Sequence, residues 1–270
     1  MKKIALIGYG AIARIVIDKL KEHDPAGDVR LMGILVREGK VEEVRQAIDE
    51  TVSVVSTIDD LIRLTPNFVV ECAGQGAVAE YGDTVLRAGL DLMIISTGAL
   101  ADETLRQKLS DTAARSSARM ILPAGAIAGI DGLNALRIGG LDQVRYTSTK
   151  PPLAWKGTPA ETNFDLTSIT EKTVLFTGPA SKAARDYPKN ANLAATVALA
   201  GLGMEKTEIQ LVADPDVAPN NVGRIDAKGR FGNLTVECRG LPAPNNPKTS
   251  ATTALSLTYA ILKGINTIVL

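Results

Sequence analysis

Residues 2–13 read KKIALIGYGAIA, and this stretch decides the fold of the chain. Residues 4–7 predict a short buried strand, and residues 14–20 predict a helix. Between them lies a G-x-G-x-x-A pattern, so that strand, glycine turn and helix start are contiguous. At this position in the chain, the pattern predicts a doubly wound α/β domain that binds a dinucleotide. The alternative is a glycine turn with a structural role only.

Each small residue of this pattern has its own task. Gly8 permits the tight turn, Gly10 lets the main chain approach a pyrophosphate, and Ala13 lets the helix pack close to the strand. The amides of Ala11 and Ile12 open the helix, where the helix dipole favours negative charge. We therefore assign these five residues to cofactor binding.

The composition is that of an ordinary soluble globular protein, with 270 residues, 45% apolar and 22% charged. Lysine plus arginine equals aspartate plus glutamate, so no net field favours nucleic acid or an anionic membrane. No apolar run reaches the roughly 18 residues of a membrane span, and no signal peptide develops. Cys72 and Cys238 are interpreted as buried free thiols. We expect a cytoplasmic protein that binds a small molecule and neither nucleic acid, membrane nor metal.

The hydrophobic pattern divides the chain into two regions. In the first, helices alternate with buried strands, which predicts a parallel sheet with strands at 4–7, 29–36, 52–56, 67–71, 92–96 and 120–122. From residue 139 onward apolar and polar residues alternate, which predicts a mixed or antiparallel sheet with one open face and strands at 144–149, 173–177, 208–213, 222–227 and 234–238. Helices are expected at 181–187, 191–202 and 247–263, the last capped by Asn246. Residues 151–163 are expected to form a loop, either over the cleft or on the surface.

The second strand ends at Val36-Arg37-Glu38, where dinucleotide-binding folds usually carry an acid for the adenosine ribose. Arg37 could pair with a 2′-phosphate, and Glu38 could still reach the ribose hydroxyls. We therefore expect NADP to be accepted, alongside NAD. The alternative is that Arg37 is a solvated loop residue.

Small residues follow two later strands, at Ala73-Gly74 and at Thr97-Gly98. The carboxyl edge of an open α/β sheet binds ligands, so small side chains there leave room for ribose and nicotinamide. Plain strand-to-helix turns are the alternative. Residues 122–131 join the two regions and are equally small, which suits either close approach to the nicotinamide or a hinge.

Two predicted helix starts carry cations and hydrogen-bonding side chains. At the first, Asn190 is a plausible N-cap, while Lys189 and Asn192 could face the cofactor and an anionic substrate. At the second, residues 248–250 add a cation and two hydroxyls, which suits a carboxylate; they are Lys248, Thr249 and Ser250. Capping alone would explain Asn246 but not these three residues.

With these residues assembled, the chain resembles the L-aspartate dehydrogenase family over nearly its full length. The resemblance rests on IGYGAIA at 7–13, VECAG at 70–74, STGAL at 96–100, LPAGAIAGIDGL at 122–133, RYTSTKPPLAWKGTPAE at 145–161, YPKNANLAATVALAGLG at 187–203, VADP at 212–215 and NPKTS at 246–250. It implies interconversion of aspartate and iminoaspartate with NAD or NADP, and a homodimer. It also implies a Rossmann domain of residues 1–123 plus 245–270 and an α+β domain of residues 124–244, which has an open-faced sheet and serves substrate binding and dimerisation. Further cofactor residues implied by the family are Ala124 or Ala126, and Asn190.

One departure from the family concerns its catalytic histidine, which follows the A-D-P motif in an N-x-H context. Here an ungapped count places Val222 at that position, and the context places Gly223 there. Neither can exchange a proton, and His23 is interpreted as a surface residue. Since amine oxidation needs a proton acceptor, the substitutes are a lysine whose pKa is lowered by burial or a water held by two asparagines. The candidates are Lys150, Lys189, Lys248, Asn220 and Asn221.

Three functions therefore stay open. The first is an amino-acid dehydrogenase or imine reductase acting on aspartate or iminoaspartate. The second is a related NAD(P)-dependent enzyme with a different carbonyl or imine substrate. The third is a dinucleotide-binding protein without turnover.

Overall fold

The computed structural model describes residues 1–243 and 246–268, without the side chains of residues 189, 242–243 and 246–249. The chain divides into two compact units, one formed by Met1–Pro123 with Thr253–Leu270 and the other by Ala124–Thr252. The second division, between residues 252 and 253, lies eight residues after the boundary expected between residues 244 and 245. Residues 246–250, expected to begin the last helix, form a strand instead. Each unit is described below by itself.

The first unit contains a parallel six-stranded sheet in the order β3-β2-β1-β4-β5-β6. Its strands are β1 (Lys2–Ile7), β2 (Val29–Leu35), β3 (Ser53–Val55), β4 (Phe68–Glu71), β5 (Asp91–Ile94) and β6 (Met120–Ile121). This is the Rossmann order, in which the chain reverses direction across the sheet between β1 and β4. The predicted parallel α/β sheet is confirmed.

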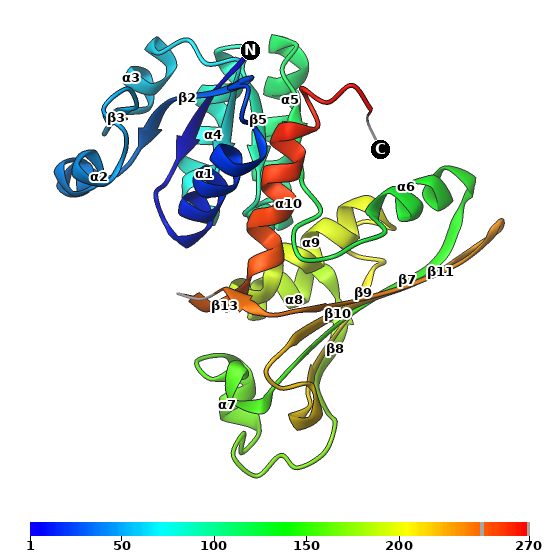
Figure 1. Ribbon diagram of the computed structural model, residues 1–270. Helices are drawn as coiled ribbons and strands as arrows, with labels where there is room; N and C mark the ends of the chain where they lie inside the picture. Colours follow the sequence, from blue (N-terminus) through cyan, green and yellow to red (C-terminus); the bar gives the residue numbers. More distant parts are fainter. Residues whose placement is uncertain (244–245, 269–270) are drawn as a thin grey trace. The chain divides into compact units, whose positions relative to one another are not determined.

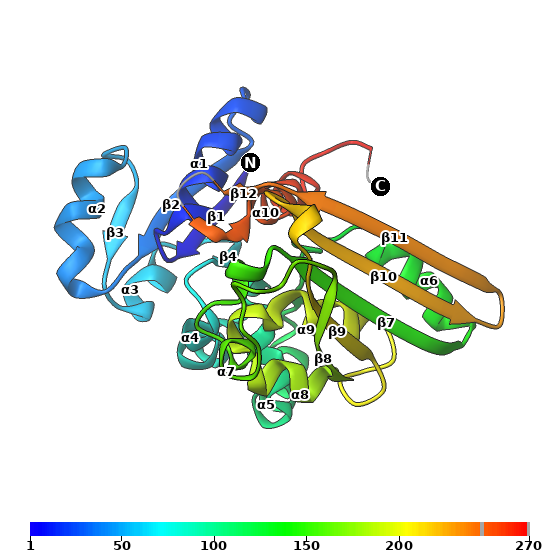
Figure 2. The same ribbon diagram turned by 90° about the horizontal axis from the view of Figure 1, so that it is seen from below.

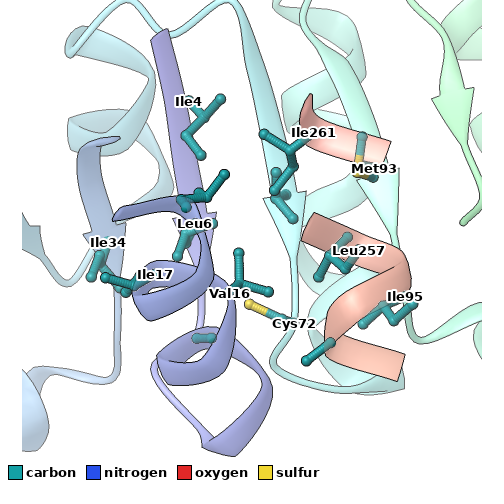
Figure 3. Packing of buried hydrophobic residues seen from close by; sticks show 14 of the residues in the cluster. Ile4, Leu6, Val16, Ile17, Ile34, Cys72, Met93, Ile95, Leu257 and Ile261 are labelled. Carbon is teal, nitrogen blue, oxygen red and sulfur yellow. The ribbon is translucent and has the colours of Figure 1, made fainter. Parts of the chain in front are cut away.

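Helices connect these strands and cover the sheet (Figure 1). They are α1 (Ala11–His23), α2 (Val41–Ala47), α3 (Ile58–Arg63), α4 (Gln75–Arg87), α5 (Glu103–Ser116) and α10 (Ala251–Leu262), with the 3₁₀ turns η1 (Glu38–Lys40) and η2 (Thr97–Ala101). Figure 3 shows Val16 of α1 and Leu257 of α10 in one buried cluster with Leu6 of β1. The C-terminal helix therefore completes the core of the first unit.

The second unit is built on a mixed five-stranded sheet in the order β11-β10-β7-β9-β8, whose strands lie side by side in Figure 2. Its strands are β7 (Leu141–Lys150), β8 (Thr173–Pro179), β9 (Glu208–Ala213), β10 (Asn221–Gly229) and β11 (Gly232–Gly240). The helices α6 (Ile130–Gly139), α8 (Ala180–Asp186) and α9 (Ala191–Ala200) lie on one face (Figure 1).

The opposite face of this sheet is the open face that the alternating pattern predicts. The aligned residues Asp226, Arg145 and Glu208 cross three strands there, and their side chains are 37%, 41% and 37% exposed. Arg145 forms an ion pair with Glu208, so this face carries charge rather than a hydrophobic core.

The segment 122–131, which was expected to join the two regions, spans the division between the units at residues 123 and 124, and α6 begins at its end. Two local predictions were wrong. Residues 151–163 contain η3 (Pro152–Trp155) and α7 (Pro159–Asn163), because the fully buried Trp155 anchors this segment to the sheet through a 3.0 Å hydrogen bond to the carbonyl of Val212. The smaller 3₁₀ turns of this unit are η4 (Pro188–Asn190) and η5 (Pro215–Val217).

The second wrong prediction concerns the start of the last helix. The segment Asn246–Ser250 is strand β13, which pairs with β12 (Pro242–Ala243), and α10 begins only at Ala251. Pairing with a neighbouring strand thus overrides the Asn-Pro signal for a helix start. Of the two cysteines, Cys72 is buried as expected, whereas Cys238 is only half-buried.

None of the helices in the described ranges 1–243 and 246–268 is long and apolar enough to cross a membrane.

Candidate functional site

The glycine turn after β1 has the geometry that a dinucleotide site requires. Gly8 has φ +97°, and a Cβ built on it would lie 2.8 Å from Cβ of Ala73, so only glycine fits there. Gly10 is different, because a Cβ there would meet nothing within 4 Å. The space beside Gly10 is therefore open to a ligand, at the N-terminus of a helix whose first turn carries no acidic residue.

A pocket of about 530 Å³ lies over this turn. It is bounded by the tip of β2 on one side and by α4 on another, and its lining residues are Ile7, Gly8, Tyr9, Gly10, Arg14, Leu35, Val36, Arg37, Lys40, Glu43, Val44, Cys72, Ala73, Ala77, Glu80 and Tyr81. Three expected cofactor residues, Gly8, Gly10 and Ala73, are thus brought together with Arg37. The open space at Gly10 and the cationic end of the pocket fit a nicotinamide dinucleotide.

The cationic end of the pocket is formed by Arg14, Arg37 and Lys40. Arg14 lies over the ring of Tyr9 at 5.0 Å, and Lys40 forms an ion pair with Glu43 at 2.5 Å. Arg37 is exposed and has no ion-pair partner among the side chains that the structure describes. Its charge is therefore available to a ligand.

Several other residues expected to bind the cofactor are not part of the pocket lining. Ala13 is fully buried in the core, as close helix-to-strand packing requires, while Ala11 and Ile12 form the first turn of α1. Thr97 and Gly98 are buried within η2 rather than lining the pocket. Ala124 and Ala126 belong to the second unit.

Glu71, at the tip of β4, organises this edge of the first sheet, and the sequence pattern alone did not single it out. Its side chain is 0% exposed. Oε1 accepts hydrogen bonds from the amides of Ala73 at 2.8 Å and Gly74 at 2.7 Å, and from Oγ of Ser96 at 2.9 Å. Oε2 accepts one from the amide of Ser96 at 3.0 Å. Gly74, with φ +136°, adopts a conformation that allows this contact.

In the second unit, Lys150 is the candidate group for proton transfer. Its Nζ donates a 2.5 Å hydrogen bond to Oδ1 of Asn190 and lies 5.2 Å from the ring centre of Trp155. Burial lowers the pKa of Lys150 from 10.5 to about 8, because no carboxylate among the described side chains offsets the loss of hydration. The residue remains partly exposed.

The hydrogen bond to Lys150 corrects the role expected for Asn190. Asn190 precedes α9 in the chain, but its side chain makes no capping hydrogen bond to that helix. Its Oδ1 accepts a hydrogen bond from Nζ of Lys150 instead, so this asparagine orients a candidate catalytic side chain.

Of the two positions expected for the family's histidine, Gly223 lies on the same face of the second sheet as Lys150, whereas Val222 pairs with Thr149 and lies on the other face. Gly223 pairs with Ser148 across β10 and β7, and a Cβ at 223 would lie 3.2 Å from Oη of Tyr146. Side chains two residues apart on a strand share a face, so Tyr146, Ser148 and Lys150 all point to this side. Asn220 and Asn221 are half-buried at the start of β10, beside the end of β7.

Other expected residues do not form a described site. Asn192 is exposed on α9, and His23 is 57% exposed at the end of α1. Ser250 ends β13, and its hydroxyl lies 3.3 Å from the carbonyl of Leu241, which gives it a structural role. The side chains of Lys189, Lys248 and Thr249 lie outside the described residues. Because α10 starts at Ala251, residues 248–250 do not supply the free helix-start amides that a carboxylate site was expected to use.

Comparison with protein-family models matches both units. Residues 8–123 match the model described as "Homoserine dehydrogenase, NAD binding domain". Residues 131–264 match the model described as "Aspartate dehydrogenase, C-terminal".

Individual relatives give the same result over the whole chain. The L-aspartate dehydrogenase of Acinetobacter baumannii is 43% identical, with 99% of each chain covered. That of Cupriavidus taiwanensis is 44% identical, with 97% of each covered. Among solved structures, aspartate dehydrogenase from Thermotoga maritima is 25% identical with a TM-score of 0.76, covering 100% of this chain and 99% of that one. The chain therefore belongs to the L-aspartate dehydrogenase family of NAD(P)-dependent oxidoreductases.

Proposed function

We propose that this enzyme interconverts L-aspartate and iminoaspartate, with the first unit binding NADP or NAD and the second unit binding the substrate. Iminoaspartate yields oxaloacetate and ammonia on hydrolysis. The observation that carries the proposal is the environment of Lys150, a partly exposed amine with a lowered pKa. It stands on the same sheet face as Gly223, which is one of the two positions expected for the family's histidine.

Lys150 takes the place of that histidine as proton acceptor. When bound, the nicotinamide supplies the hydride acceptor or donor. Neutral Lys150 removes a proton from the substrate ammonium and so prepares the amine for oxidation. Asn190 accepts a hydrogen bond from Nζ and fixes its position. In the reductive direction, protonated Lys150 returns the proton to the nitrogen.

The other polar residues of this edge have supporting roles in the proposal. Asn220 and Asn221 orient the water that hydrolyses the iminium, since both are half-buried at the start of β10. Lys189, Asn192, Lys248 and Thr249 supply charge and hydrogen bonds to the two carboxylates of the substrate. Ser250, whose hydroxyl hydrogen-bonds to the carbonyl of Leu241, keeps acceptor capacity for the substrate.

We expect the purified enzyme to oxidise NADPH when oxaloacetate and ammonia are added together, measured as a fall in absorbance at about 340 nm. Omitting ammonia is the control, because reduction of the imine requires it. Turnover with other 2-oxo acids, but not with oxaloacetate, would favour the related enzyme with a different substrate. A flat trace with NADPH and NADH, from protein shown to bind them, would contradict an enzymatic role.

The pocket supports a preference for NADP. Arg37 lines it, whereas the neighbouring Glu38 does not. An arginine at the tip of β2 accommodates a 2′-phosphate, while an acid there would bind the ribose hydroxyls of NAD. Arg14 also lines this end of the pocket, and while the charge of Lys40 is offset by Glu43, the two arginines suit the additional phosphate.

Arg37→Ser should raise the Kd of NADPH by about 10- to 100-fold, as expected for one lost charge-assisted hydrogen bond. The Kd of NADH should change by less than about threefold, because NADH lacks the phosphate. Calorimetric titration measures both constants. Arg45→Ser is the matched control, since Arg45 is an exposed arginine that pairs with Glu42 and is not part of the pocket lining. If Arg37→Ser raises the Kd values of NADH and NADPH by the same factor, Arg37 does not bind the 2′-phosphate.

We further propose a cytoplasmic homodimer. The two unpaired cysteines, Cys72 and Cys238, suit a reducing compartment. The open face of the second sheet, with Arg145, Glu208 and Asp226, offers a surface for a second copy. Light scattering of the purified chain measures the oligomeric state, and a monomer at micromolar concentration would contradict the proposed dimer.

A further inference from the structure

Glu71 is a buried carboxylate that no cation neutralises. It is fully buried, and no lysine or arginine in the described part of the chain forms an ion pair with it. Buried acids are usually paired, because removing a charge from water is costly. Here four hydrogen-bond donors from two loops replace the cation, three of them backbone amides.

These donors favour the ionised form of the carboxyl. An amide can only donate, so a carboxylate that accepts on both oxygens satisfies all three amides at once. Burial raises the pKa of Glu71 above its ordinary value, and the hydrogen bonds from Gly74, Ser96 and Ala73 offset part of that rise. In the carboxylate form, the charge is held by these four hydrogen-bond dipoles in a region of low dielectric.

The position of this charge is as informative as its burial. Glu71 pairs with Ile7 of β1 and with Ile94 of β5, so it stands on the carboxyl edge of the sheet. The strand order reverses between β1 and β4, and dinucleotides bind across this point. The next residue, Cys72, lines the pocket and its thiol donates to the carbonyl of Gly8 at 3.8 Å.

We propose that Glu71 is a positioning residue whose uncompensated charge makes the site favour the oxidised, positively charged nicotinamide over the neutral reduced one. The carboxylate also holds the loops after β4 and β5 in place, through Gly74 and Ser96. The oxidised nicotinamide ring then supplies the positive charge that the protein lacks near Glu71. The proposal rests on dinucleotide binding by the first unit and is independent of the substrate proposed above.

The test measures the Kd of NADP⁺ and of NADPH for Glu71→Gln, without substrate, by titration calorimetry. Glutamine keeps the shape of the side chain and removes its charge. We expect the ratio of the Kd of NADP⁺ to the Kd of NADPH to rise by about tenfold. This is the effect of one unit charge on another across about 10 Å at an effective dielectric constant of about 20. The Kd of NADPH should change little by comparison.

Ser96→Ala is the matched control, because it removes one hydrogen bond to Glu71 and keeps the charge. Ser96→Ala should raise the Kd of NADP⁺ and the Kd of NADPH by the same factor, so the ratio of the two constants should stay unchanged. If Glu71→Gln also leaves the ratio unchanged, the role of Glu71 is structural only and the proposal is overturned.

The unmodified enzyme provides a test that does not depend on the folding of a variant. It should bind NADP⁺ at least as tightly as NADPH. A preference for NADPH of about tenfold or more would overturn the proposal, because a negative charge at this edge of the sheet favours the cationic form of the nicotinamide.

Discussion

Lys150→Met should lower kcat/KM for L-aspartate oxidation by about 10²- to 10⁴-fold, the usual cost of removing a general base. In the unmodified enzyme the rate should rise with pH and reach a plateau above about 8, where Lys150 loses its proton. The sign follows from the chemistry, since only the neutral amine accepts the substrate proton. In the methionine variant this rise should be absent. Measuring kcat/KM from pH 6 to about 10 tests both expectations.

Two controls separate the chemistry of Lys150 from its charge and from folding. Lys150→Arg keeps a cation that does not deprotonate, so it should be about as inactive as Lys150→Met. Lys156→Met changes an exposed lysine of the following segment and should leave the rate unchanged. An ionisation near pH 8 that persists in Lys150→Met would assign the proton to another group.

The stability of Lys150→Met should not account for its loss of activity. Because burial lowers the pKa of Lys150 in the folded chain, its contribution to stability is present above pH 10.5 and is lost as pH falls through about 8. At pH 7 the ammonium therefore opposes folding. The methionine variant should melt at or above the temperature of the unmodified enzyme, which calorimetry measures.

Gly8→Ala should destabilise the first unit and weaken dinucleotide binding, whereas Gly10→Ala should weaken binding alone. The added methyl at Gly8 would meet backbone and side-chain atoms of Ala73 within 3 Å, at a φ of +97°. We expect a loss of about 1–3 kcal/mol in the free energy of unfolding. At Gly10 the methyl meets nothing, so the free energy should change by less than about 1 kcal/mol.

The affinity for NADPH should fall by roughly 100-fold in both variants, since a pyrophosphate needs close approach to the helix amides. Thermal melting with and without NADPH, together with Kd values, separates the two effects. Gly10→Ala serves as the control for Gly8→Ala, because it occupies the binding space without straining the turn. Unchanged affinity in Gly10→Ala would show that the phosphates do not bind at the start of α1.

Patterns that are local in the chain were sufficient for most of the fold. Buried strands such as Lys2–Ile7 contain apolar runs, here residues 4–7, and the strand Glu208–Ala213 was predicted with its observed bounds. Local signals failed where a distant contact decided the outcome. The Asn-Pro pair at residues 246–247 signals a helix start, but this segment pairs with β12 instead.

The sequence by itself determined the Rossmann unit, the glycine turn at Gly8 and Gly10, and the class of cofactor, because these depend on hydrophobic period and on residues adjacent in the chain. It also named Lys150, but only as one of three lysines. The tertiary structure alone brought Asn190 to Lys150 across 40 residues and Ser96 to Glu71 across 25. The lowered pKa of one group and the uncompensated charge of the other arise from burial among distant parts of the chain, which no local pattern encodes.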